Sequence, residues 1–431
     1  MAAMDFPASP TDGQVYENYV WSAATGAWLS RGVTQTTAVT SDVAPSNPKA
    51  GDMWYNSTDG VMYLYYYDGN SSQWVQFKND ASFTSELGPT VDALDIAGNV
   101  NFIINGAFEI NQRNFSSTTT TSQFGFDRWF MGGSGGTITY SAQTLSPGTI
   151  PTAYESSNSA RIVSSGQSGV GDWAALSQRI ENVRTLAGQT VTVSFWAKAA
   201  SGTPNVGITF EQEPGAGGSA NTVTSATVKA ITNSWARYSF TVTLPTLSGK
   251  TVTADSYVQL YIFTSAGTTL SGLGYPAVGV QNATIDFWGV QVQAGSKATN
   301  FHRAAPTLQG ELAACQRYYY RSIGDSGVYT GHGTGLISGY AGGIYSYFLI
   351  PMPVTMRVAP TSIDSSAYGT FTVSDGVNVS TNTALPALST NNSSRNNAFI
   401  TATHGGLTSY RPAWFQANNT TSSYIGFVAE L

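Results

Sequence analysis

The segment Val191-Thr-Val-Ser-Phe-Trp-Ala197 decides the fold class, because an apolar residue stands at every second position along it. This two-residue period places alternate side chains on opposite faces of a β-sheet, so that one face can be buried. Tyr257-Val-Gln-Leu-Tyr-Ile-Phe263 follows the same pattern, and clusters of Gly, Pro, Asn and Ser separate such runs at short intervals. The spacing predicts an all-β chain with a jelly-roll β-sandwich over residues 101–304, rather than βαβ units. Its other clear strands are predicted at residues 102–104, 161–163, 206–210, 235–242 and 283–288.

One linking helix is predicted within residues 305–322, directly after the sandwich. Pro306 and Thr307 mark its start, and one stripe of the helix carries Leu308, Leu312, Cys315, Gln316 and Tyr319. The tyrosines at 318–320 continue this pattern. Residues 323–431 return to strands and turns, which predicts a C-terminal β-sandwich and a candidate receptor-binding domain. Within it, residues 348–354 are predicted to form an edge strand, because two prolines do not fit a central one.

The first 80 residues contain a degenerate repeat. Pro10-Thr-Asp-Gly13 matches Pro48-Lys-Ala-Gly51, and each copy is followed by an aromatic run that ends in a tryptophan, Trp28 or Trp74. Residues 1–80 are therefore predicted to form two small β-modules for attachment. Modules of a few strands bury too little surface to be stable alone, so they are expected to rest on another chain or a larger assembly. Residues 81–100 are predicted to be a connector with at most a short helix.

The composition excludes several classes of protein. Only 10% of the 431 residues are charged, 12% are aromatic and the net charge is -6, which argues against disorder and against nucleic-acid binding. The single cysteine, Cys315, cannot form a disulfide within the chain, and three histidines without a cluster predict no metal site. A structural calcium ion is left open, although no dense Asp motif is present. No apolar run is long enough to enter a membrane, and the start of the chain lacks a secretory signal.

Candidate binding residues come from the aromatic side chains. Sugar binding needs flat aromatic faces together with fixed polar partners for the hydroxyl groups. Trp173 follows the glycine-rich stretch Gly166-Gln-Ser-Gly-Val-Gly-Asp172 and is predicted to contact carbohydrate, with turn packing as the alternative. In the last domain, the predicted carbohydrate contacts are Tyr410, Arg411 and Trp414 with His404, and the alternative is a strand that enters the core. No catalytic motif and no cofactor are predicted; Glu211 and Glu213 share a strand face but are expected to lie on a solvated edge.

Several stretches together resemble the tail fibres and tailspike-type adhesins of tailed bacteriophages. They include Asn101-Phe-Ile-Ile-Asn-Gly-Ala-Phe-Glu109, Phe126-Asp-Arg-Trp129, Ser194-Phe-Trp-Ala-Lys198 and Val290-Gln-Val-Gln-Ala-Gly-Ser-Lys-Ala-Thr299. The central stretch is similar to the jelly-roll carbohydrate-binding modules that also occur attached to polysaccharide-degrading enzymes. The resemblance implies a trimeric, elongated virion protein whose N-terminus attaches to the particle.

The expected function is therefore that of a non-enzymatic phage virion fibre protein that attaches to a glycan on the host cell surface. The expected partners are two further copies of the chain, other tail or baseplate proteins bound through the N-terminus, and host surface polysaccharide. The chain is expected to be made in the host cytoplasm and to reside in the virion. Two alternatives stay open: a polysaccharide depolymerase, and a purely structural component of the baseplate or head.

Overall fold

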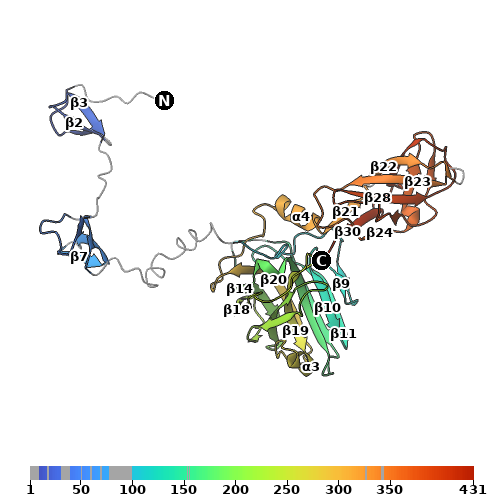
Figure 1. The fold of residues 1–431 in the computed structure, drawn as a ribbon, viewed down its shortest axis with the longest axis horizontal. Helices are drawn as coiled ribbons and strands as arrows, with labels where there is room; N and C mark the ends of the chain where they lie inside the picture. The colour runs from blue at the N-terminus through green and yellow to red at the C-terminus, as the bar shows by residue number, and fades with distance from the viewer. Residues whose placement is uncertain are drawn as a thin grey trace. The chain divides into compact units, whose positions relative to one another are not determined.

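The computed structural model describes residues 9–16, 19–30, 39–49, 51–58, 61–67, 70–76, 100–152, 154, 156–325, 328–340 and 344–431. The chain divides into two compact units, residues 1–97 and 98–431 (Figure 1). The predicted connector at 81–100 lies outside the described residues, apart from Val100. No helix in the part of the chain that the structure describes is long and apolar enough to cross a membrane.

The first unit contains two small sheets. An antiparallel sheet is formed by β1 (Val15–Tyr16), β2 (Tyr19–Ser22) and β3 (Ala27–Ser30). The second sheet consists of β4 (Val39–Ser41), β5 (Met53–Asn56), β6 (Val61–Tyr67) and β7 (Ser72–Gln76), with β4 and β5 parallel. Trp54 is buried in it and stacks on Tyr63, with ring centroids 4.9 Å apart. The predicted small β-modules are confirmed as part of an all-β chain.

The central domain packs two antiparallel sheets face to face. We call the first the β19 sheet; its order is β16 (Thr222–Ser225), β15 (Asn205–Glu213), β19 (Tyr257–Ala266), β13 (Trp173–Glu181), β10 (Phe130–Ser134) and β9 (Gln123–Phe124), and β17 (Lys229–Ala230) also pairs with β15. The second, the β20 sheet, has the order β18 (Ala236–Thr243), β14 (Thr190–Ala199), β20 (Thr284–Ala294), β12 (Asn158–Ser165), β11 (Thr137–Thr144) and β8 (Ser117–Thr118).

The core of the sandwich is built by the alternation that the sequence shows. Phe195 and Phe287 from the β20 sheet lie fully buried with Phe210 and Leu260 from the β19 sheet. The β-sandwich prediction for the central region is thus confirmed. Short helices sit at the ends of strands: η2 (Val183–Thr185) follows β13, and α3 (Thr268–Gly272) follows β19.

The linking helix is shorter than predicted. Helix α4 covers Leu308–Gln316, and the Thr307 hydroxyl caps it by accepting a hydrogen bond from the Gly310 N–H at 3.0 Å. The expectation that Tyr318–Tyr320 continues the helix is wrong, because β21 (Tyr319–Ile323) pairs with β30 (Tyr424–Val428) more than 100 residues away. Strand pairing overrides the local helical pattern here.

The C-terminal domain is a second sandwich. Its small sheet has the order β21, β30 and β24 (Ser362–Ser365), and η4 (Tyr368–Thr370) follows β24. Its large sheet has the order β26 (Val379–Thr381), β25 (Phe371–Ser374), β29 (Pro412–Ala417), β22 (Gly331–Ile337), β23 (Tyr345–Pro351), β28 (Asn397–Thr403) and β27 (Ala387–Leu388). β23 lies between two strands, so the predicted edge strand at 348–354 is wrong. Pro351 ends that strand and therefore does not interrupt its pairing.

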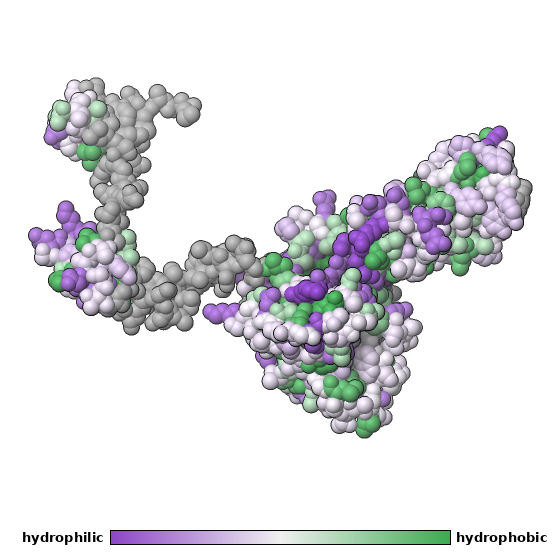
Figure 2. Space-filling view, in the orientation of Figure 1, coloured by the Kyte–Doolittle hydropathy of each residue, from purple (hydrophilic) through white to green (hydrophobic). Residues whose placement is uncertain are grey.

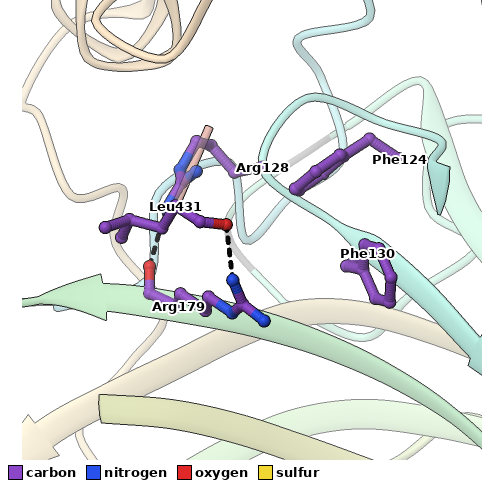
Figure 3. Close-up of a pocket in the computed structure, with 5 residues that line it drawn as sticks. All are labelled: Phe124, Arg128, Phe130, Arg179 and Leu431. Carbon is purple, nitrogen blue, oxygen red and sulfur yellow. Dashed lines mark hydrogen bonds between the residues drawn. The ribbon is translucent and has the colours of Figure 1, made fainter. Parts of the chain in front are cut away.

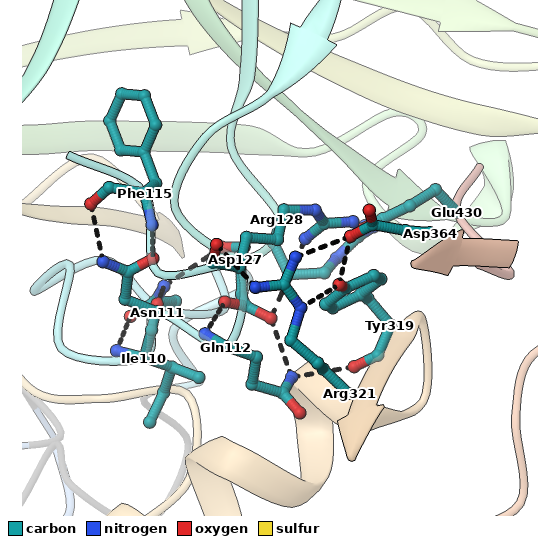
Figure 4. A network of polar contacts seen from close by, with 12 residues as sticks. Ile110, Asn111, Gln112, Phe115, Asp127, Arg128, Tyr319, Arg321, Asp364 and Glu430 are labelled. Carbon is teal, nitrogen blue, oxygen red and sulfur yellow. Dashed lines mark hydrogen bonds and ion pairs between the residues drawn. The ribbon is translucent and has the colours of Figure 1, made fainter. Parts of the chain in front are cut away.

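A buried polar network joins the two sandwiches of the second unit (Figure 4). The Arg128 guanidinium is paired with the Glu430 carboxylate, and Arg113 donates to the same carboxylate at 3.2 Å. Asp127 lies 3.8 Å from Arg113 and accepts two hydrogen bonds from Gln112. Asp127 and Arg128 therefore pair with different partners, Arg113 and Glu430, and the neighbouring Trp129 is buried in the core.

The C-terminal domain contributes its own charges to this junction. Arg321 donates to Asp364 at 2.8 Å, and the Tyr319 hydroxyl donates to the same carboxylate at 2.6 Å. Closer to the surface, Arg317 makes a bidentate pair with Glu181, with both distances 2.9 Å. Figure 2 shows strongly hydrophilic residues gathered where the two sandwiches meet.

Candidate carbohydrate-binding face

The outer face of the β19 sheet carries aromatic and polar side chains in adjacent rows. Strand alternation turns Val258, Leu260 and Ile262 into the core, so Tyr257, Gln259 and Tyr261 point outward from β19. The pairing of β19 with β13 and β15 places Ser177 and Thr209 beside Tyr261 and, in the next row, Arg179 and Glu211 beside Gln259. We call this surface the β19 face; it consists of Ser177, Arg179, Thr209, Glu211, Tyr257, Gln259, Tyr261 and Tyr275.

The polar side chains of the β19 face hold one another in place. Arg179 Nε donates to Gln259 Oε1 at 3.0 Å, and Gln259 Nε2 donates to Ser177 Oγ at 2.9 Å. The Arg179 guanidinium also lies over the Tyr257 ring, 4.4 Å from its centroid. This chain of contacts fixes the amide and the guanidinium before any ligand arrives, which lowers the entropy that binding costs.

Tyr261 is the aromatic centre of the β19 face. Its half-buried ring stacks on Phe263, with centroids 5.4 Å apart and planes at 19°, and Tyr275 stands nearly perpendicular to it at 6.1 Å. The Tyr275 hydroxyl lies 3.4 Å from Glu211 Oε2, and Asn221 donates to the other carboxylate oxygen. Burial, reinforced by Glu211, raises the pKa of Tyr275 to about 12 and raises that of Tyr261 as well. Both phenols are therefore neutral hydrogen-bonding groups at neutral pH.

The segment after β19 closes one end of the face. Pro276 and Val278 pack so tightly on β15 that a Cβ at Gly207 would lie 2.6 Å from the Pro276 side chain. Phe263 is buried beneath this segment.

A small cavity lies at the other end of the β19 face, near Arg179 (Figure 3). It measures about 40 Å³ and is lined by Phe124, Arg128, Phe130, Arg179 and Leu431. Arg179 Nη1 donates to the Leu431 carbonyl at 2.6 Å there. The cavity has room for a water molecule and not for a sugar ring, so the candidate surface is the open part of the face around Tyr261.

Trp173 lies at the end of the β19 sheet that Pro276 and Val278 cover. It is the first residue of β13, and its half-buried ring packs on Phe263, with centroids 6.0 Å apart. A Cβ at Gly132 would lie 2.7 Å from the indole, so the ring also covers this glycine. Its predicted contact with carbohydrate stays a prediction, while the packing that was its alternative is present.

The four residues predicted in the C-terminal domain differ in exposure, because only His404 is buried. Tyr410 and Trp414 are exposed, and Arg411 makes an ion pair with Asp375 at 3.5 Å. His404 is buried, and its Nε2 lies 2.8 Å from Ser346 Oγ. The placement of His404 in a surface platform is therefore wrong. Sugar contact by Tyr410, Arg411 and Trp414 stays a prediction.

Sequence reasoning missed Arg179, Gln259, Tyr261 and Tyr275. The available signal was in the strand that helped decide the fold: the outward positions of Tyr257-Val-Gln-Leu-Tyr-Ile-Phe263 carry tyrosine and glutamine, rather than the serine and threonine usual on a solvated strand. Within the described residues, no group of three or more His, Cys, Asp or Glu could hold a metal ion.

Comparison with known proteins identifies the central region. Residues 100–267 match the family model described as a carbohydrate binding domain, whereas no curated protein matches the chain in sequence. Among solved structures, the enzymatically active domain of tailspike protein 4 from bacteriophage CBA120 is 15% identical, with 46% of this chain and 22% of that chain covered and a TM-score of 0.28. The CBM22-1 xylan-binding domain from Paenibacillus barcinonensis Xyn10C is 14% identical, with 47% and 98% covered and a TM-score of 0.27. The family 11 carbohydrate-binding module of the Clostridium thermocellum cellulase Lic26A-Cel5E is 9% identical, with 42% and 96% covered and a TM-score of 0.26. The family match confirms the predicted resemblance of the central domain to carbohydrate-binding modules.

Proposed function

We propose that the protein is an adhesin that binds a surface glycan through the β19 face and does not cleave it. The observation that carries the proposal is that Tyr261 lies one row away from the fixed amide of Gln259 and the guanidinium of Arg179 on the same face of the sheet. This surface belongs to the domain whose sequence matches a carbohydrate-binding family. An aromatic ring next to fixed polar groups is the combination that sugar recognition requires.

The binding mechanism follows from the chemistry of a pyranose ring. The C–H face of the sugar packs on the exposed side of Tyr261, which is held from behind by Phe263. Its hydroxyl groups donate to Glu211 and accept from Arg179, which the buried Gln259 holds in place. Low charge elsewhere on the surface makes such binding depend little on salt.

Attachment also needs several weak sites to act together. We propose that three copies of the chain form one fibre in a phage virion and that the N-terminal modules join it to other tail or baseplate proteins. Each copy then presents one β19 face, and the linked faces raise the effective concentration of binding sites. The support for this part is the resemblance to tail-fibre sequences and the small size of the N-terminal sheets.

The first experiment measures glycan binding by the full chain on an array of bacterial surface polysaccharides. We expect Tyr261→Ala to weaken binding about tenfold or more, because covering an aromatic ring contributes roughly 1.5–3 kcal/mol. Tyr368→Ala is the matched control, since this tyrosine is exposed and lies in the other domain. A folded Tyr261→Ala protein that binds as tightly as the control would overturn the assignment of the face.

Two further measurements separate the proposal from its alternatives. Released reducing ends after incubation with the bound polysaccharide would indicate a depolymerase and contradict the non-enzymatic part. Labelled antibodies on intact particles would locate the chain, and a protein in the virion that binds no glycan would favour a purely structural role.

A further inference from the structure

The C-terminal domain exposes far more apolar surface than the central one. Among the described residues between 101 and 300, the exposed large hydrophobic side chains are Val170 and Leu273. In the shorter span 323–431 they are Ile323, Val328, Tyr329, Leu336, Tyr340, Tyr347, Leu349, Tyr368, Val377, Val379, Leu385, Tyr410 and Trp414. A monomer gains nothing from leaving so many apolar groups in water, so this domain has surface that a partner would cover.

Strand register gathers part of this set on the outer face of the large sheet. One row across four strands consists of Trp414, Thr334, Leu349 and Phe399, and the neighbouring row of Pro412, Leu336, Tyr347 and Thr401. We call these eight side chains the β22 face. Tyr347 and Phe399 stack across strands at 6.0 Å, which makes the surface continuous from β29 to β28.

The β22 face is large and carries no charge. Trp414, Leu349, Leu336 and Tyr347 are 45%, 46%, 44% and 39% exposed. With the other four side chains they present roughly 500 Å², which is the size of the largest, often functional, patches on monomers. Tyr345 extends the face along β23, and the 73% exposed Tyr340 lies against its ring. The total then approaches the roughly 800 Å² that each partner buries in a standard protein interface.

The chemistry of the β22 face differs from that of the β19 face. Its two middle strands pair Leu336 with Tyr347 and Leu349 with Thr334, and the branched leucines offer a sugar no flat surface. No fixed amide or charged group stands among its eight residues, whereas Gln259 and Arg179 accompany Tyr261 on the β19 face. Such a surface suits the apolar side chains of another protein better than the hydroxyl groups of a glycan.

We propose that the β22 face is the surface through which copies of this chain associate. A charged partner would bury unpaired charge against it, which is costly, so its partner must be equally apolar and uncharged. A second copy meets this requirement, because each face is neutral and can pack against its own kind, as symmetric assemblies do. The inference does not depend on glycan binding by the central domain.

The test measures the mass of the full chain in solution by sedimentation, for the natural protein and for Leu336→Glu and Leu349→Glu. Both side chains are nearly half exposed, so a monomer tolerates the change, while association requires the new carboxylates to be desolvated. We expect the natural chain to be an oligomer. We expect the dissociation constant of each variant's oligomer to be at least tenfold higher than that of the natural chain. Leu273→Glu, on the exposed surface of the central domain, is the matched control and is expected to stay assembled. Leu349→Ser and the circular dichroism spectrum and melting temperature of each variant check that loss of assembly is not loss of folding.

A second readout uses an introduced cysteine, because the single native cysteine, Cys315, is buried. A short thiol cross-linker is expected to join copies of the Leu349→Cys protein and not copies of the Leu273→Cys protein. A monomeric natural chain overturns the inference, as does an oligomer that survives Leu349→Glu and fails to cross-link at position 349. If the natural chain is monomeric and Trp414→Ala abolishes glycan binding, the face is a sugar site instead.

Discussion

The ion pair between Arg128 and Glu430 gives the sharpest test of how the two sandwiches are held together. The side chains are 1% and 5% exposed, so Glu430→Gln leaves a guanidinium buried without its counter-charge. Removing one partner of a buried pair costs about 3–5 kcal/mol, and we expect about 3 kcal/mol because the amide oxygen still accepts a hydrogen bond. Glu181→Gln is the matched control: its pair with Arg317 is 33% and 39% exposed, and exposed pairs contribute about 0.2–1 kcal/mol.

The assay is urea unfolding of the full chain, followed by circular dichroism at neutral pH. The double variant Arg128→Met/Glu430→Gln is expected to recover part of the loss, since the unpaired cation is gone while the methionine stem fills its volume. Equal destabilisation by Glu430→Gln and Glu181→Gln, or a double variant less stable than Glu430→Gln, would refute the reasoning that burial makes this pair critical.

Four further predictions follow from buried groups. Burial raises the pKa of Asp127 from 3.8 to about 6, so the native state holds this proton more tightly than the unfolded state. The free energy of unfolding therefore falls by up to about 3 kcal/mol as the pH rises from 3.8 to about 6. Asp127→Asn should remove that fall in thermal melts measured across this pH range. His332 acts in the opposite sense, because burial lowers its pKa from 6.5 to about 4, and the stability of its neutral form is lost as the pH falls from 6.5 to 4; His332→Asn should therefore steepen the fall seen with rising pH. The Cys315 thiol, buried and with a raised pKa, should react with iodoacetamide only after denaturation, and rapid labelling of native protein would contradict its position. Gly106→Ala should lower the melting temperature, because its Cβ would lie 2.0 Å from the Val290 carbonyl oxygen, and overpacking of this kind costs about 1–3 kcal/mol; an unchanged melting temperature would speak against this contact.

The strands could be predicted wherever alternation was strong. The stretch at 191–197 lies within β14 and the stretch at 257–263 within β19, because their apolar positions meet the facing sheet. The end of the linking helix could not be predicted. Tyr319 leaves the helix for a strand that pairs with β30, and a local pattern holds no information about that partner.

The candidate site was harder to predict than the fold. An aromatic residue on a strand reads as core until the sheet shows which face it occupies, and Tyr261 is such a residue. The polar network between the two sandwiches could not be predicted, because Arg128 and Glu430 are 302 positions apart in the sequence. Their pairing depends on how one sandwich rests on the other, which composition and periodicity do not encode.

The contact between Arg179 and Leu431 has a mechanical consequence. Arg179 belongs to the β19 face, while Leu431 follows β30 of the C-terminal domain, and Arg357 grips the same segment by donating to the carbonyls of Ala429 and Glu430. A force that pulls the two sandwiches apart is therefore carried by these side-chain contacts with residues 429–431 as well as by the backbone that connects the domains. The junction therefore resists separation through several hydrogen bonds at once, and not through the connecting backbone alone.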